Sequence, residues 1–223
     1  MSYVLVHLVG DEATQCLKVL VDHVARAKPA AKSFRERHPD HGDVKAVPPT
    51  GAVANAAVCF AHGSELGLGA EPGHIWADAQ QLGDIFSGKR VYAHACQTLG
   101  GANPLGRRAV EAGVAVFVGH DGPIMAELPG PDREAAAEVA GAPILLFLDG
   151  VSDAERLRAA LYDASDELIR FPIHRDARAA GAANAWTQSM VLEKLAKTLT
   201  VHLPEADPGH RKADKTERAD AGV

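Results

Sequence analysis

The chain has 223 residues, of which 47% are hydrophobic and 23% are charged. This composition is ordinary for one soluble globular domain. The formal net charge of −6, without a cluster of Lys and Arg in the part expected to fold, argues against nucleic acid as a partner. No apolar run approaches the about 20 residues that a helix needs to span a bilayer, so no membrane partner is expected either.

The cysteines and the first residues favour a cytoplasmic location. Cys16, Cys59 and Cys96 are too few and too far apart for a disulfide framework, which indicates a reducing compartment. Residues 1–10 lack the basic segment of a signal peptide and run directly into an apolar strand pattern. We therefore expect a cytoplasmic protein.

The first half of the chain predicts strands that alternate with helices. The apolar run Tyr3 to Val9 predicts a buried strand, and Asp11 can cap the helix that follows it. Residues 29–49 are rich in Pro, His and Gly and predict a long loop, either functional or disordered, with at most a short strand near Val44 to Val47. Three more apolar runs predict strands: Asn55 to Ala61, Arg90 to Ala95 and Val114 to Val118.

The second half has helical patterns. Helices are predicted over Asp132 to Ala140 and over Asn184 to Leu199, whereas Ile144 to Leu148 fits either a strand or a helix. Residues 204–223 are polar and have no periodicity, which predicts a disordered tail. We expect a single α/β domain over residues 1–203, with a mostly parallel sheet covered by helices on both faces.

Residues with catalytic chemistry follow three of the predicted strands. His62, Cys96 and His120 each stand where an apolar run ends. The carboxyl ends of parallel strands share one edge of a sheet, and neighbouring strands lie roughly 4.8 Å apart. A histidine beside a cysteine can take the thiol proton and later protonate a leaving amine. The glycine after His62, Gly63, lets the backbone approach a substrate, so its N–H and that of Cys96 can bind an oxyanion.

The sequence around these residues contains three segments in a characteristic order: "VCFAHGSE", "IWADAQQLGDIFSGKRVYAHACQT" and "ANPLGRRAVEAGVAVFVGHDGPI". They resemble the core of the CHAT-type cysteine peptidases of the caspase-like clan, and the resemblance covers about Ala52 to Leu161. It implies a caspase-like three-layer sandwich and a cysteine endopeptidase that needs no cofactor. Cys96 would be the nucleophile and His62 the general acid and base, with the N–H groups of Gly63 and Cys96 as the oxyanion hole.

The same resemblance implies the partners and a substrate pocket. The substrate would be a protein or peptide, and an activating or sensor protein, a cleavage, or ordering of residues 29–49 would control the exposed thiol. The pocket for the residue before the scissile bond would lie at the carboxyl edge of the sheet. Acidic residues and the absence of Arg and Lys there predict a weak preference for Lys or Arg over Asp. The candidate pocket residues are Asp11, Glu12, His94, Gln97, His120 and Asp121.

Other interpretations of these residues remain open. Asp11 can merely cap a helix and Asp121 can merely form a turn, in which case the pocket would accept a neutral side chain. Cys96 can be a structural thiol in a catalytically silent caspase-like interaction module. A zinc site formed by His62, His94, Cys96 and His120 would make a metal-dependent hydrolase, although their spacing matches no compact zinc signature. Cys59, inside an apolar run, is expected in the core.

Overall fold

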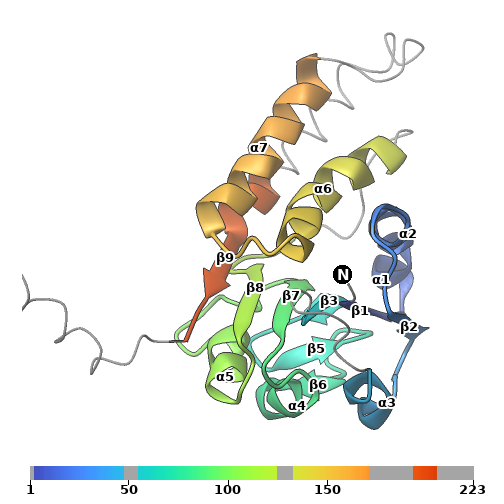
Figure 1. Cartoon of the computed structure of the whole chain (residues 1–223), viewed down its shortest axis with the longest axis vertical. Coiled ribbons are helices and arrows are strands. Elements are labelled where there is room, and N and C mark those ends of the chain that lie inside the picture. Colours follow the sequence, from blue (N-terminus) through green and yellow to red (C-terminus); the bar gives the residue numbers. More distant parts are fainter. Residues whose placement is uncertain (1–2, 48–54, 125–132, 171–192, 205–223) are drawn as a thin grey trace, which may run out of the picture.

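A six-stranded, mostly parallel sheet forms the centre of the fold (Figure 1). The computed structural model describes residues 3–47, 55–124, 133–170 and 193–204. The strands are β1 (Tyr3–Leu8), β2 (Lys32–Glu36), β3 (Ala56–Phe60), β7 (Arg90–His94), β8 (Val116–His120) and β9 (Leu199–His202). They lie in the order β2-β1-β3-β7-β8-β9. The first five are parallel, and β9 is antiparallel to β8. The predicted mostly parallel α/β sheet is therefore confirmed.

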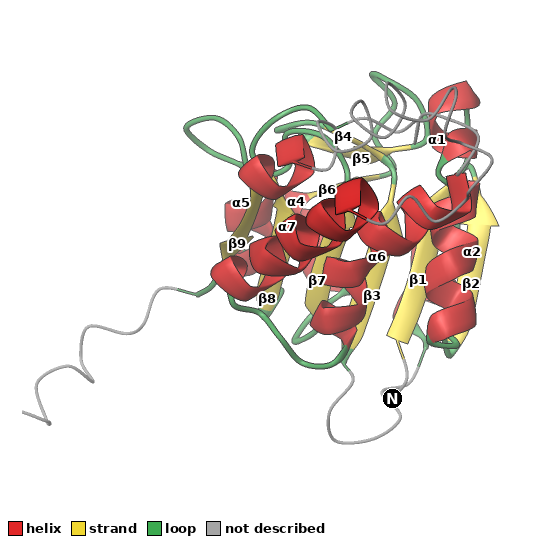
Figure 2. Cartoon of the chain, turned by 90° about the horizontal axis from the view of Figure 1, so that it is seen from above, coloured by secondary structure: helices red, strands yellow, loops and turns green. Residues whose placement is uncertain are grey.

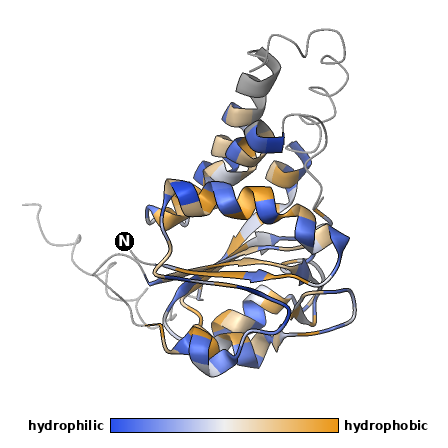
Figure 3. Ribbon diagram, turned by 90° about the vertical axis from the view of Figure 1, so that its right-hand side faces the viewer, coloured by the Kyte–Doolittle hydropathy of each residue, from blue (hydrophilic) through white to orange (hydrophobic). Residues whose placement is uncertain are grey.

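Helices cover both faces of the sheet. One face carries α2 (Lys18–Ala27), α6 (Arg133–Leu148) and α7 (Ala154–Arg170), which lie in front of the strands in Figure 2. The other face carries α3 (His41–Lys45), α4 (Ala79–Ile85) and α5 (Leu105–Glu111). In Figure 3 the strands lie between these two layers of helices, whose ribbons carry both hydrophobic and hydrophilic residues. The described residues thus form a three-layer arrangement.

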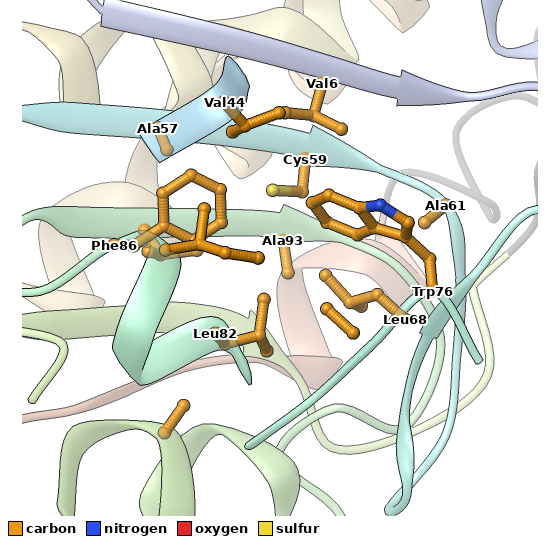
Figure 4. Close-up of a cluster of buried hydrophobic side chains, with 14 of the residues drawn as sticks. Val6, Val44, Ala57, Cys59, Ala61, Leu68, Trp76, Leu82, Phe86 and Ala93 are labelled. Carbon is orange, nitrogen blue, oxygen red and sulfur yellow. The ribbon is translucent and has the colours of Figure 1, made fainter. Parts of the chain in front are cut away.

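Alternating strand residues pack into two separate cores. Leu5, Val58 and Tyr92 pack with the helices α2, α6 and α7, whereas Val6 and Cys59 point to the opposite face. Figure 4 shows the second core, where the Cys59 sulfur lies among apolar side chains. Cys59 is fully buried, as its position inside an apolar run predicted. Burial of both faces explains why these strands are apolar throughout.

A small antiparallel sheet continues from the carboxyl end of β3. It consists of β4 (His62–Gly63), β5 (Gly67–Gly69) and β6 (Ala77–Asp78), in that order. Only Ala61 separates β4 from the end of β3. The connection fixes His62 and Gly63 next to the main sheet, and the return of the chain through β5 and β6 holds them there.

The predicted long loop over residues 29–49 is wrong for the part that the structure describes. This segment contains the edge strand β2 and the helix α3, and Val44, predicted within a short strand, is a buried residue of α3. In β2 only Phe34 is buried, so no apolar pattern marked it as a strand. Asp40 begins α3 by accepting a hydrogen bond from the Asp43 N–H at 3.0 Å.

The carboxyl-terminal elements also differ from the prediction. Ile144 to Leu148 is helical and belongs to α6, which contains Pro143. Residues 193–198 are helical, but the chain changes to strand at Leu199, so the predicted end of the last helix is wrong. Its residues 184–192 and the predicted tail from residue 205 onward lie outside the described residues. Among the described helices, none has both the length and the apolar character that crossing a membrane requires.

Candidate active site

His62 and Cys96 follow neighbouring strands of the main sheet. β3 pairs with β7 so that Phe60 lies opposite His94, and the Ala61 N–H donates to the His94 carbonyl oxygen at 3.4 Å. Extending this register by two residues places His62 beside Cys96. The carboxyl ends of two adjacent parallel strands therefore bring the two residues to one edge of the sheet.

Gly63 lies directly against the peptide of Cys96. A Cβ atom at Gly63 would be 2.3 Å from the Cys96 carbonyl oxygen and 2.8 Å from the Ala95 Cβ. Side-chain carbons do not approach a backbone oxygen so closely, so only glycine fits between the two segments. The contact shows that the His62–Gly63 segment and Cys96 are immediate neighbours in space.

Two backbone N–H groups are available beside this contact. The Ser64 N–H donates to the Gly67 carbonyl oxygen at 3.1 Å, and Gly63 lies opposite Leu68 in the same hairpin. Because hydrogen-bonded and non-hydrogen-bonded pairs alternate in antiparallel strands, the Gly63 N–H is directed away from β5. Among the described residues, the Cys96 N–H donates to no backbone carbonyl. These two groups have the chemistry that an oxyanion hole requires.

The turn that carries Cys96 is strained and tightly held. Gln97 has a φ of 52°, in the left-handed region that costs a residue with a side chain about 1–2 kcal/mol. The turn is held because the Gln97 N–H donates to Gly122 at 3.0 Å and the Leu99 N–H donates to His120 at 2.9 Å. Backbone strain next to a half-buried cysteine is typical of a site that presents a nucleophile.

The sulfur of Cys96 contacts the backbone N–H and the carbonyl oxygen of one residue after β8, Ile124. The Ile124 N–H donates to the sulfur at 3.3 Å, and the thiol is 3.4 Å from the Ile124 carbonyl oxygen, to which it can donate. The sulfur is therefore held in place through backbone contacts, which sequence reasoning did not anticipate.

His62 is hydrogen-bonded to a carboxylate from a third strand end. Its Nε2 lies 2.8 Å from Oδ2 of Asp11, and the side chains are 26% and 33% exposed. Burial tends to raise the pKa of Asp11, but hydrogen bonds from Thr14 and His62 outweigh this effect and lower the pKa below its usual value. Asp11 also caps α1 (Glu12–Cys16), as predicted. The strands β1, β3 and β7, which are neighbours, thus deliver Asp11, His62 and Cys96 to one edge.

His94 and His120 belong to a row of buried rings below this edge. The ring centroids of His7 and Phe60 are 6.3 Å apart, those of Phe60 and His94 5.9 Å, and those of His94 and His120 5.7 Å. His94 is 2% exposed and His120 is 1% exposed. His94 and His120 were expected to line the wall of the substrate pocket. Because they present almost no surface, the structure does not place them in an accessible wall, and this expectation is corrected. Among the described residues, His94 Nδ1 and His120 Nε2 have no hydrogen-bond partner.

Acid should destabilise the fold through these histidines. Desolvation lowers the pKa of His94 from 6.5 to about 4, and desolvation followed by the His94 charge lowers that of His120 well below 6.5. Between about pH 6.5 and 4 these two histidines bind more protons in the unfolded chain than in the folded one. Their contribution to the free energy of unfolding is therefore complete above about pH 6.5 and is lost as the pH falls towards 4. His94 alone should contribute about 3 kcal/mol of this loss.

Urea unfolding at several pH values measures this effect. The variant His94→Phe should show a smaller loss of stability between pH 6.5 and 4, whereas His74→Gln, a change at an exposed histidine, should not. An unchanged pH dependence in His94→Phe would contradict the burial of an uncharged imidazole.

Gln97, Glu12 and Asp121 are exposed at this edge of the sheet. A Cβ atom at Gly100 would be 2.5 Å from the Asp121 carbonyl oxygen, so the Asp121 turn packs on the turn that follows Cys96. Of the candidate pocket residues, these three present accessible side chains, and Asp11 is engaged with His62.

The residues considered for zinc do not form a metal-binding cluster. His62 is bonded to Asp11, His94 packs against His120, and the Cys96 sulfur contacts Ile124. Within the part of the chain that the structure describes, no three His, Cys, Asp or Glu side chains are grouped so that they could hold a metal ion. The arrangement brings a thiol and an imidazole that is bonded to a carboxylate to the same edge of the sheet.

No protein-family model, no curated protein and no solved structure matches this chain. Its function must be inferred from the residues themselves.

Proposed function

We propose that the chain is a cysteine endopeptidase with a caspase-like core, in which Cys96 is the nucleophile and His62 the general acid and base. The observation that carries the proposal is the contact of Gly63 with the Cys96 peptide, where a Cβ would lie 2.3 Å from the carbonyl oxygen. It places the His-Gly end of one strand against the Ala-Cys end of its neighbour, as the resemblance to CHAT-type peptidases requires.

The reaction follows from the positions of these groups. His62 takes the proton of the Cys96 thiol, and the sulfur attacks the carbonyl carbon of the scissile peptide. The N–H groups of Gly63 and Cys96 bind the oxyanion of the tetrahedral intermediate. His62 then gives its proton to the leaving amine, and the carbon–nitrogen bond breaks to leave a thioester. Water, deprotonated by His62, hydrolyses the thioester and restores the thiol.

Control by a partner protein is part of this proposal. The Cys96 sulfur contacts the Ile124 N–H at 3.3 Å and the Ile124 carbonyl oxygen at 3.4 Å, and the Gly122 carbonyl oxygen accepts a hydrogen bond from the Gln97 N–H. An activating or sensor protein that moves residues 122–124 would open the sulfur to a substrate. The sequence also suggested that ordering of residues 29–49 could control activity. We no longer propose this, because β2 and α3 already form much of this segment.

The contacts of Cys96 with Ile124 also favour one other function. A sulfur whose hydrogen bonds are satisfied by the backbone suits a catalytically silent interaction module with the same fold. This candidate does not account for Gly63 at the Cys96 peptide or for a carboxylate on His62. It remains the second candidate for these reasons.

Internally quenched peptides that differ only at the residue before the scissile bond test the proposal. We expect cleavage that iodoacetamide abolishes and a chelator leaves unchanged. Lys, Arg or a neutral residue should be preferred over Asp or Glu, because Glu12 and Asp121 are exposed at the same edge and attract cations. Asp121→Asn should reduce any preference for Lys or Arg.

A preference for Asp or Glu would overturn the proposed specificity. Cleavage that a chelator abolishes would overturn the thiol mechanism. Absence of cleavage in every peptide, also after limited proteolysis of the full chain, would favour the silent module.

A further inference from the structure

The carboxylate of Asp11 determines which nitrogen of His62 carries a proton. The low pKa of Asp11 keeps it ionised at neutral pH, and an ionised carboxylate can only accept hydrogen bonds. The 2.8 Å contact between Asp11 Oδ2 and His62 Nε2 therefore requires the hydrogen to be on Nε2. The neutral imidazole then has its lone pair on Nδ1, which is the nitrogen left to receive a proton.

Asp11 is held rigidly for this contact. Its Oδ1 accepts a hydrogen bond from the Thr14 N–H at 3.0 Å, while the Thr14 hydroxyl accepts one from the Asp11 N–H at 3.1 Å. Thr14 is itself buried, and its carbonyl oxygen lies 2.7 Å from Nε2 of His7. One carboxylate oxygen is thus fixed by the helix cap, and the other is directed at His62.

The other acidic side chain packed against this turn is engaged elsewhere. A Cβ at Gly10 would be 2.7 Å from Cγ of Glu71, but Glu71 pairs with Arg37 at 2.6 Å and lies 3.6 Å from His74. The side chain of Glu12, next to Asp11, is exposed. Among the described residues, Asp11 is accordingly the carboxylate bonded to His62.

We propose that Asp11 is a positioning residue of the Cys96–His62 pair and not a wall of the substrate pocket. This inference rests on the proposed peptidase function. Asp11 fixes the His62 ring in the tautomer with Nε2–H, so that Nδ1 receives the thiol proton of Cys96. The carboxylate also stabilises the imidazolium that this transfer creates. The three groups come from the adjacent strands β1, β3 and β7.

The variant Asp11→Asn tests the role of the charge, since asparagine caps a helix as well as aspartate does. Its amide has both a donor and an acceptor, so it no longer selects one tautomer of His62. We expect kcat to fall on the order of 10²-fold or more, while KM changes less than about threefold.

The matched control is Asp78→Asn. Asp78 caps α4 with the same kind of capping box as Asp11, in which its side chain accepts from the Gln81 N–H at 2.9 Å. This variant should keep kcat within about twofold of the wild type, because the cap is retained and none of the described histidines is hydrogen-bonded to Asp78. An equal loss of kcat in both variants, or an Asp11→Asn variant with wild-type kcat, would overturn the inference.

A second measurement does not depend on peptidase activity. In ¹⁵N and ¹H spectra of the full chain, His62 should show an Nε2–H proton that is shifted downfield and exchanges slowly with water. The signal, assigned by its loss in His62→Gln, should disappear in Asp11→Asn and persist in Asp78→Asn. Its presence in a wild-type chain that stays inactive after limited proteolysis, and whose Cys96 does not react with a peptidyl acyloxymethyl ketone, would refute the peptidase function and retain the Asp11–His62 bond. Its absence in the wild type would refute the positioning role of Asp11.

Discussion

Replacing Cys96 by alanine should lower peptide cleavage by at least about four orders of magnitude, because the attacking sulfur is removed. His62→Ala should cause a loss of similar size, because the proposed base is removed. The double variant should be about as inactive as either single variant, because a nucleophile and its base act as one unit. Initial rates with an internally quenched peptide measure all three effects.

Cys59→Ala is the matched control for this prediction. Cys59 is fully buried in the second core (Figure 4), and burial raises the pKa of its thiol to about 12. Its loss should cost about 1 kcal/mol of stability and leave the cleavage rate of the folded protein unchanged. Cleavage by pure Cys96→Ala protein at the wild-type rate would exclude Cys96 as the nucleophile.

Gly63→Ala should damage both stability and activity. The new methyl group would meet the Cys96 carbonyl oxygen at 2.3 Å and the Thr98 Cγ2 at 2.9 Å. A backbone oxygen cannot move away by a change of rotamer, so the ends of β3 and β7 must move apart. We expect a loss of about 1–3 kcal/mol in the free energy of unfolding. The shift also displaces the Gly63 N–H, and loss of one oxyanion donor lowers kcat by about 10²- to 10³-fold.

Gly42→Ala provides the comparison at a glycine whose Cβ would contact no backbone atom. Gly42 lies in α3, and its Cβ would lie 3.0 Å from Oδ1 of Asp40, which caps the helix through the Asp43 N–H. This variant should lose at most about 1 kcal/mol of stability, because a small shift of Asp40 weakens the cap while alanine favours helix, and its kcat should be unchanged. Thermal unfolding and kcat, measured for Gly63→Ala and for Gly42→Ala, test this prediction. A Gly63→Ala protein with wild-type stability and kcat would contradict the packing of Gly63 on Cys96.

The central strands were predictable because both of their faces are buried. β1, β3 and β7 are continuous apolar runs, and the sequence places their ends within one or two residues. The edge strands were not predictable for the opposite reason. In β2 only Phe34 is buried, and in β9 only Leu199 is buried. Their pairing depends on distant strands, about which local periodicity has no information.

The positions of the candidate site residues were predictable, whereas their contacts were less so. Cys96, His62 and Gly63 stand at strand ends, which the apolar pattern locates. The bond between Asp11 and His62 depends on β1 lying next to β3, which is a property of the sheet order. The positive φ of Gln97 could not be predicted, because glutamine has no preference for that region.

The burial of His94 and His120 could not be read from the sequence either. The strand period shows that His94 and Cys96 share a side, but not that side chains from other strands cover it. The rings pack against Phe60 and against each other. This row depends on the register of β3, β7 and β8, which only the assembled sheet determines.

The proposed mechanism requires Cys96 to be a nucleophile that His62 activates. Its most direct test is labelling of the full chain with a peptidyl acyloxymethyl ketone, followed by mass-spectrometric mapping of the modified residue. We expect label on Cys96, none on the buried Cys59, no effect of a chelator, and a large loss of labelling in His62→Ala. Label that spares Cys96, or that modifies Cys96 equally fast in His62→Ala, would contradict it.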